Sequence, residues 1–188
     1  MDDKIIATFC LCDDLLKAIH HQEDGQCQMN DAEIMTTALI ASLFFRGNQE
    51  SARAMLKQYN YIPHMLSKSR FSRRLHRIKE IFLVLFDLLA QIWKTLCKDS
   101  IYLIDSFPIS VCDNIRIPRS KIYTDEKFRG YKASKKRYFY GLKIHLMVTK
   151  DGQPVECFLT PGSFGDVDAL KCYAYELPDG SIIYADKA

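Results

Sequence analysis

The stretch Ile101-Tyr102-Leu103-Ile104-Asp105-Ser106-Phe107-Pro108 decides the fold of the second half of the chain. Its apolar and aromatic residues predict a short strand, and Pro108 is expected to end it because proline has no N–H for the ladder. A nearly continuous apolar strand is usually buried on both faces. A carboxylate at the end of such a strand costs free energy unless a partner compensates it. Two interpretations of Asp105 therefore stay open: a cap of the following turn, or a metal-binding carboxylate at the mouth of a sheet.

A second short apolar strand, residues 181–186, also ends in a carboxylate, Asp186. Between the two strands we predict a hairpin, with strands at 138–149 and 155–160, and a helix at 167–177 that Asp166 caps. A helix between two strands favours a parallel return into the same sheet. Asp105 and Asp186 would then emerge at one edge, where two convergent carboxylates can hold Mg²⁺.

The hairpin strand at 138–149 alternates in character, with apolar residues on one face and Lys143 and His145 on the other. His145 by itself is more often a structural residue than a catalytic one.

The first half of the chain is helical by its apolar periodicity. Helices are expected at 3–20, at 31–45 with a capping box from Asn30 to Glu33, and at 50–59. One long helix should follow, with a basic head and a tail at 81–96 that is apolar nearly all round and therefore buried. These helices fit either a helix-turn-helix or a plain bundle with a charged end.

The composition changes near Lys98, where β-forming residues begin to dominate. The sequence therefore predicts an α+β protein with a helical, DNA-binding region at 1–98 and a mixed β-sheet domain at 99–188.

Two blocks carry most of the positive charge. Residues 64–79 hold six Lys and Arg and no Asp or Glu, and residues 113–143 hold ten against three. The whole chain has a net charge of only +3, so the remainder is acidic. Such separation indicates a polyanionic partner, and the aromatic residues within the second block suit a nucleic acid. On the basis of their charge, six residues are predicted to contact phosphate: Arg70, Arg73, Arg74, Lys135, Lys136 and Arg137.

The sequence predicts a cytoplasmic protein. Its acidic start is not followed by a long apolar run, which argues against a signal peptide, and no apolar stretch reaches the ~20 residues of a membrane span. Seven irregularly spaced cysteines do not predict a disulfide framework.

Four blocks of the second half resemble a bacterial insertion-sequence transposase of the DDE class, closest to the insertion-sequence family numbered 982. They are residues 105–108, 135–145, 159–163 and 184–188, and residues 66–77 in the first half resemble that family too. The resemblance covers roughly residues 30–188.

This resemblance implies an RNase H-like catalytic domain in which two Asp and one Glu bind Mg²⁺ or Mn²⁺. Asp105 matches the first Asp and Asp186 the second. It also implies a mobile-element enzyme that acts in DNA transposition and recombination, in the bacterial nucleoid, as a homo-oligomer on element ends and target DNA. The family's Glu lies well downstream of the second Asp, whereas Glu156 and Glu176 lie upstream of Asp186. We therefore expect an incomplete, C-terminally truncated RNase H-like domain.

Other hypotheses follow from the same residues. A catalytically inactive fragment that acts only as a DNA-binding regulator accounts for the missing Glu. A different RNase H-like nuclease would act on RNA or on structured DNA. A purely structural protein explains neither the basic blocks nor the paired Asp residues.

Overall fold

The computed structural model describes residues 1–113, 119, 121–123, 125–132 and 136–186. Contacts divide the chain into two compact units, Met1–Phe86 and Asp87–Ala188. The division falls within helix α5 (Lys79–Leu96). Each unit is described by itself below, and the domain boundary expected after residue 98 stays a prediction.

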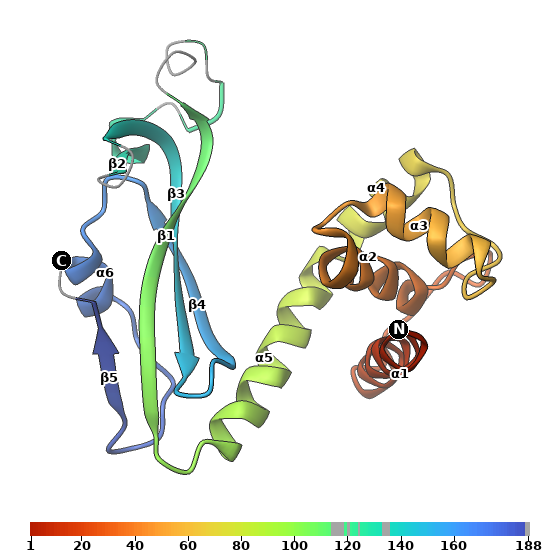
Figure 1. Cartoon of the computed structure of the whole chain (residues 1–188), viewed down its shortest axis with the longest axis horizontal. Coiled ribbons are helices and arrows are strands. Elements are labelled where there is room, and N and C mark those ends of the chain that lie inside the picture. Colours follow the sequence, from red (N-terminus) through yellow and green to blue (C-terminus); the bar gives the residue numbers. More distant parts are fainter. Residues whose placement is uncertain (114–118, 120, 124, 133–135, 187–188) are drawn as a thin grey trace. The chain divides into compact units, whose positions relative to one another are not determined.

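The first unit is helical (Figure 1). It contains α1 (Asp2–Ala18), α2 (Asp31–Phe45), α3 (Gln49–Gln58), α4 (Lys68–Arg77) and the first turns of α5. Helix α2 has the predicted bounds and the predicted capping box. The Asn30 side chain accepts from the Glu33 N–H at 2.7 Å, and the Glu33 carboxylate accepts from the Asn30 N–H at 2.8 Å. Apolar residues from all four complete helices form its core, among them Ile5, Cys12, Ile34, Met35, Ile40, Leu56 and Phe71.

The prediction of one long helix up to residue 96 was wrong, because α4 ends at Arg77 and α5 starts at Lys79. Complete burial of the apolar half of α5 was also wrong. Leu85 and Ala90 are buried, but several of its large apolar residues are exposed: Leu83, Val84, Leu88, Ile92 and Leu96. A helix that packs with one side leaves its other side in water.

None of the helices in the described ranges is long and apolar enough to cross a membrane.

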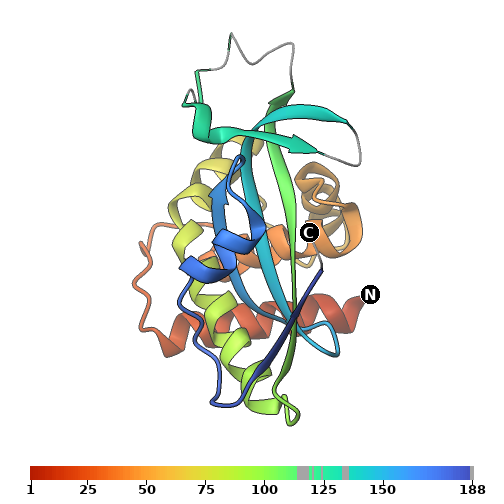
Figure 2. The same ribbon diagram turned by 90° about the vertical axis from the view of Figure 1, so that its left-hand side faces the viewer.

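The second unit is built on a mixed sheet of β1 (Ile101–Asp113), β2 (Arg129–Lys132), β3 (Arg137–Thr149), β4 (Pro154–Pro161) and β5 (Ile182–Ala185). The order is β2-β3-β1-β5, and β4 pairs with β3. The predicted hairpin is the antiparallel β3–β4 pair. The predicted parallel return is confirmed, because β5 lies beside β1 and parallel to it (Figures 1 and 2). The fold class is therefore mixed α and β, as expected.

Two expectations for the β1 strand were wrong. Pro108 lies inside the strand, opposite Lys143 of β3. Past Ile104 the pairs among the described residues join this strand to β3, so a residue without an N–H can lie there with its nitrogen turned away from β3. The strand is also buried on only one face, since Tyr102 and Ile104 are buried while Leu103 and Phe107 are exposed.

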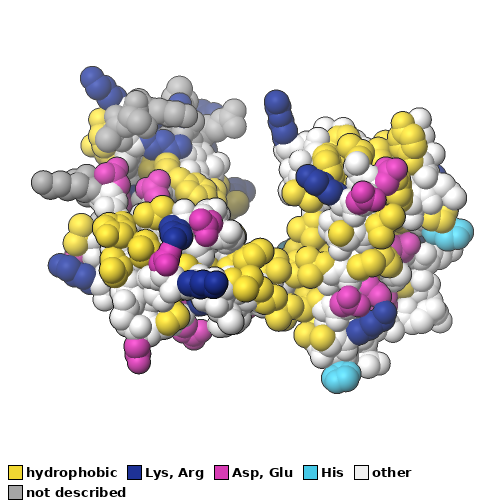
Figure 3. Space-filling model, turned by 60° about the horizontal axis from the view of Figure 1, so that its bottom comes forward, with side chains coloured by type: hydrophobic (Ala, Val, Ile, Leu, Met, Phe, Trp, Pro, Cys, Tyr) yellow, Lys and Arg dark blue, Asp and Glu magenta, His cyan; other side chains and the backbone are white. Residues whose placement is uncertain are grey.

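The core of the second unit lies on one face of the sheet. Its centre is Tyr102, Ile104, Met147 and Val155, and apolar residues of α5, of β4 and of the segment after helix α6 (Asp166–Cys172) pack on it: Trp93, Cys97, Phe158, Leu170, Tyr175 and Leu177. On β3 the deeply buried face carries His145 and Met147. The other face, with Leu142, Ile144, Leu146 and Val148, is only half-buried. The opposite face of the sheet keeps large apolar side chains of β1 exposed, namely Leu103, Phe107 and Ile109. Figure 3 shows that hydrophobic side chains lie at the surface of the molecule in that view.

Candidate active site

Asp105 and Asp186 follow the last residue pair of the parallel β1–β5 ladder. Ile104 pairs with Ala185, so the two aspartates are the next residues on neighbouring strands. Paired strands lie about 4.8 Å apart, and opposite residues of such a pair point to the same face. Both aspartates are exposed. The Asp105 carboxylate accepts a hydrogen bond from the Ser106 N–H at 2.7 Å, which holds its Oδ1 close to the backbone.

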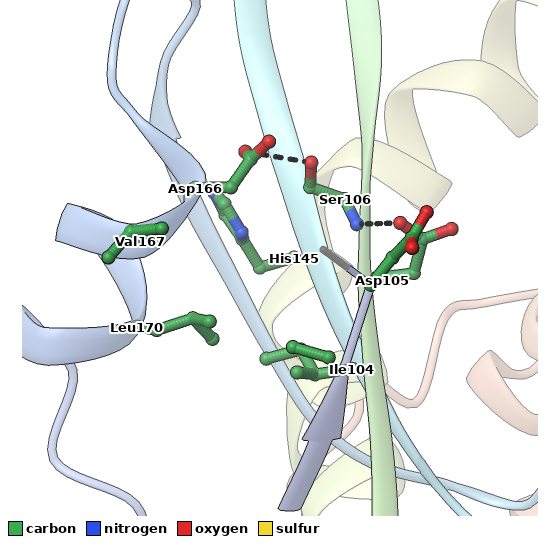
Figure 4. Close-up of a pocket in the computed structure, with 9 residues that line it drawn as sticks. Ile104, Asp105, Ser106, His145, Asp166, Val167 and Leu170 are labelled. Atoms are coloured by element: carbon green, nitrogen blue, oxygen red, sulfur yellow. Dashed lines mark hydrogen bonds between the residues drawn. The ribbon is translucent and has the colours of Figure 1, made fainter. Parts of the chain in front are cut away.

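A cavity of about 160 Å³ lies where β1, β3, β5 and α6 meet. Its lining is Ile104, Asp105, Ser106, His145, Asp166, Val167, Leu170, Ala185 and Asp186. Figure 4 shows Asp166 and Ser106 turned toward each other, while the Asp105 carboxylate points away from Asp166. The cavity therefore brings together residues that lie far apart in the sequence.

Asp166 is not the helix cap that the sequence predicted. The N-cap of α6 is Gly165, and Asp166 is the first helical residue. Its Oδ1 accepts from the Ser106 Oγ at 2.8 Å and from the Lys143 Nζ at 3.1 Å. Burial opposes ionisation of Asp166, but the hydrogen bonds from Ser106 and Lys143 outweigh it and lower its pKa. An ionised Asp166 therefore ties α6 to β1 and β3, directly beside Asp105.

Helix α6 is also shorter than predicted, because it ends at Cys172. Beyond it, Tyr173 stacks on Phe158 with ring centroids 4.0 Å apart, and Tyr175 meets the same ring edge-on. The aromatic contacts hold this segment against the sheet in place of a further helical turn.

His145 forms the buried wall of the cavity. Its Nε2 lies 2.9 Å from the Thr160 Oγ1, and its ring stacks on Phe158 at 4.6 Å. Burial lowers the pKa of His145; nearby Asp166 opposes this shift and Lys143 adds to it. A neutral, hydrogen-bonded and stacked imidazole favours the structural interpretation of this residue.

The sequence reasoning missed Asp166, Ser106 and Lys143 as neighbours. The signal that was present is the alternation of β3, which puts Lys143 and His145 on one face. What covers that face is decided by where α6 packs, and no local pattern encodes it.

The donor set at the two strand ends suits a hard cation. Mg²⁺ takes oxygen ligands and is often held by one or two carboxylates together with waters and substrate phosphates. Asp105 and Asp186 supply two such carboxylates. Among the residues that the structure describes, no group of three or more His, Cys, Asp or Glu could hold a metal ion. Asp166, whose Oδ1 accepts from Ser106 and Lys143, is not part of such a group.

The predicted phosphate contacts differ in their surroundings. Arg70, Arg73 and Lys136 are exposed, and Arg137 is half-buried. The Arg74 side chain is only 14% exposed and its guanidinium is bonded to Asp31 and Glu23. Lys135 lies outside the described residues.

Comparison with known proteins identifies the second unit. The model of the transposase DDE domain family matches residues 95–188, which is half of the chain. This range contains Asp105, Asp186 and the cavity beside them. No curated protein and no solved structure gives a significant match. The chain therefore belongs to the transposases with a DDE domain.

Proposed function

We propose that this chain works in the metal-dependent cleavage and transfer of DNA strands during transposition of an insertion sequence, and that Asp105 and Asp186 are its first two metal-binding acids. The single observation that supports this is the β1–β5 register, which makes the two carboxylates neighbours across 81 residues of sequence. The family match covers both of them.

The carboxylates of Asp105 and Asp186 are suited to bind a divalent cation. Two exposed carboxylates on adjacent strands repel each other, so a cation between them relieves that repulsion. The bound Mg²⁺ or Mn²⁺ would supply charge stabilisation for the attacking and leaving oxygens of a phosphodiester. The Ser106 N–H fixes one Asp105 oxygen, and Asp166 holds the Ser106 hydroxyl at 2.8 Å. These contacts position the first acid before substrate arrives.

The assignment to a particular transposase family rests on the resemblance of several sequence blocks to insertion-sequence DDE transposases. We infer an RNase H-like sheet from the strand order, with β5 returning parallel to β1 after α6, and membership of the insertion-sequence family numbered 982. DNA at the element ends and at the target, a homo-oligomer on that DNA, and a place in the bacterial nucleoid belong to the same inference. Basic residues of both blocks, Arg70, Arg73, Lys135, Lys136 and Arg137, are the proposed contacts to phosphate. Arg74 belongs to the set predicted from charge, but its guanidinium is already bonded to Asp31 and Glu23.

A cleavage assay tests the proposal. The substrate is labelled duplex DNA that carries the element end flanking the gene, with Mg²⁺ or Mn²⁺ varied and a chelator as the blank. Asp105→Asn and Asp186→Asn should each reduce strand cleavage at least ~100-fold with DNA binding retained, because each removes a charged metal ligand. Asp151→Asn, in the exposed turn between β3 and β4, is the matched control. Cleavage that persists in the chelator, or in both variants, refutes the proposal.

A second candidate function is a DNA-binding regulator without catalysis. It is favoured by one observation: the described part of the chain contains no group of three or more His, Cys, Asp or Glu that could hold a metal ion. Salt-sensitive DNA binding together with no cleavage at any metal concentration would support the regulator over the enzyme. A preference for an RNA–DNA hybrid in the same assay would instead support an RNase H-like nuclease of another kind.

A further inference from the structure

Helix α4 carries its arginines on one side. Arg70, Arg73, Arg74 and Arg77 recur at steps of three and four, which puts them on a single helical face. Together with residues 26–28 and Leu66 they line a groove of about 420 Å³ in the first unit. The helix contains no acidic residue. Like charges at this spacing on a helix repel one another unless an anion compensates them.

Arg74 differs from the other three arginines because its charge is already compensated. Its Nη2 donates to the Glu23 Oε1 at 2.7 Å and to an Asp31 Oδ1, and its Nη1 contacts the Cys27 Sγ at 2.6 Å. Asp31 is further bonded to the His21 ring at 2.9 Å. Arg74 therefore fastens the segment before α2 against α4, and this contact forms one wall of the groove.

Arg70, Arg73 and Arg77 keep their charge available. All three are exposed, and within the first unit, which the structure describes throughout, none of them forms an ion pair. The Nε of Arg73 donates to the Ser69 carbonyl oxygen at 3.3 Å, which leaves the rest of its guanidinium facing solvent. Guanidinium groups of this kind bind phosphate with two parallel hydrogen bonds.

The spacing matches the backbone of a nucleic acid duplex. Arg77 lies seven positions after Arg70, which is about 10.5 Å along the helix axis. Successive phosphates of one DNA strand rise about 3.4 Å along the duplex axis, so the three arginines span about three phosphates. Contacts from arginine to phosphate position a protein on the duplex and carry no sequence information.

We propose that this groove, formed by Arg70, Arg73 and Arg77 with residues 26–28, binds the sugar-phosphate backbone of duplex DNA, and that Arg74 builds the groove without contacting DNA. The inference rests on the proposed function, because it assigns DNA as the polyanion. It revises the predicted contacts by replacing Arg74 with Arg77, which charge counting could not separate.

The test is a binding titration without divalent metal. Fluorescence anisotropy of a labelled duplex of about 25 base pairs is measured in a chelator from 50 to 200 mM salt. Each phosphate contact contributes about 0.9 to the slope of log K against log salt. The triple variant Arg70→Ala, Arg73→Ala, Arg77→Ala should lower the slope by about 2.7, which removes a roughly 40-fold salt effect over this range. Lys4→Ala, an exposed cation of α1, is the control and should leave the slope unchanged.

Arg74→Met provides the contrast. We expect it to lower the melting temperature of the helical unit, and to leave the salt slope of the folded protein within about 0.3 of the parent. An unchanged slope in the triple variant, or a loss of slope in Arg74→Met at unchanged stability, overturns the inference. Tighter binding of duplex RNA than duplex DNA overturns it as well.

The two proposals fail separately. Asp105→Asn tests cleavage and leaves α4 untouched, whereas the triple arginine variant is scored by binding alone. Normal salt-dependent binding with no cleavage refutes only the enzyme, and cleavage with an unchanged slope refutes only the groove.

Discussion

A buried ion pair between Lys94 of α5 and Glu156 of β4 gives the sharpest stability prediction. The Lys94 Nζ lies 2.5 Å from the Glu156 Oε1, and the two side chains are 7% and 9% exposed. The second Glu156 oxygen accepts from the Tyr173 hydroxyl at 2.9 Å. Glu156→Gln keeps the volume and an oxygen acceptor but leaves the Lys94 ammonium without a counter-charge.

The loss of unfolding free energy in Glu156→Gln can be estimated from the burial of this ion pair. Removing one member of a buried pair typically costs 3–5 kcal/mol, and retention of the tyrosine contact places Glu156→Gln near the lower end, about 3 kcal/mol. For a unit of about 100 residues each kcal/mol shifts Tm by about 4–8 °C, so a fall of roughly 12–24 °C is expected for the second unit. The double variant Lys94→Met, Glu156→Gln should recover at least ~2 kcal/mol, because no buried charge is left unpaired.

Trp93 makes the measurement selective. It is the only tryptophan of the chain and packs against the core of the second unit, so its fluorescence in a urea titration follows that unit. Asp99→Asn, which breaks an exposed pair with Lys150, is the matched control and should cost less than about 1 kcal/mol. The reasoning fails if Glu156→Gln costs no more than this control, or if the double variant is no more stable than Glu156→Gln.

Three further outcomes are expected. Gly141→Ala should destabilise the second unit by about 2 kcal/mol or more in the same titration, because φ is +157° and a Cβ would lie 2.0 Å from the Ile109 carbonyl oxygen; an unchanged urea midpoint contradicts this. Burial, with help from its bond to a carboxylate, raises the pKa of Tyr173 to about 12. The folded state then keeps a proton that the unfolded state loses from about pH 10, so stability falls between pH 10 and 12, and Tyr173→Phe should flatten this fall in urea midpoints measured across that range. Asp166→Ala should lower metal-dependent cleavage about 10-fold with duplex binding unchanged, because the Ser106 hydroxyl beside Asp105 loses its acceptor. Asp166→Asn still accepts a hydrogen bond and should lose less cleavage activity. Equal losses of activity in the two variants would count against a positioning role of Asp166.

Local patterns were sufficient where a segment makes its own structure. The capping box from Asn30 to Glu33 and the apolar run behind it predicted α2 to the residue, because both ends of that signal lie within one helical turn. The β3–β4 hairpin followed in the same way from alternation and a tight turn. The parallel return of β5 was predicted by a topological rule, which needs only the order of the elements.

Local patterns failed where another element decides the outcome. A proline inside β1 is tolerated because, among the described residues, the β1–β5 pairs end at Ile104 and Ala185, before Pro108 is reached. The arginines of α4 look alike in the sequence, but Arg74 alone reaches two carboxylates on a neighbouring segment. Asp166 has the position of a helix cap, yet it bonds two strands instead.

The sequence by itself therefore determined α1, α2 and α3, the β3–β4 hairpin and the parallel return of β5 beside β1, since hydrophobic periodicity, caps and connection rules act over short range or through element order. Only the tertiary structure decided which face of β3 is buried, which arginine is neutralised and which acid supports Ser106. Those outcomes depend on side chains that meet across the sheet or between helices, and burial makes each unpaired charge costly enough to select its partner.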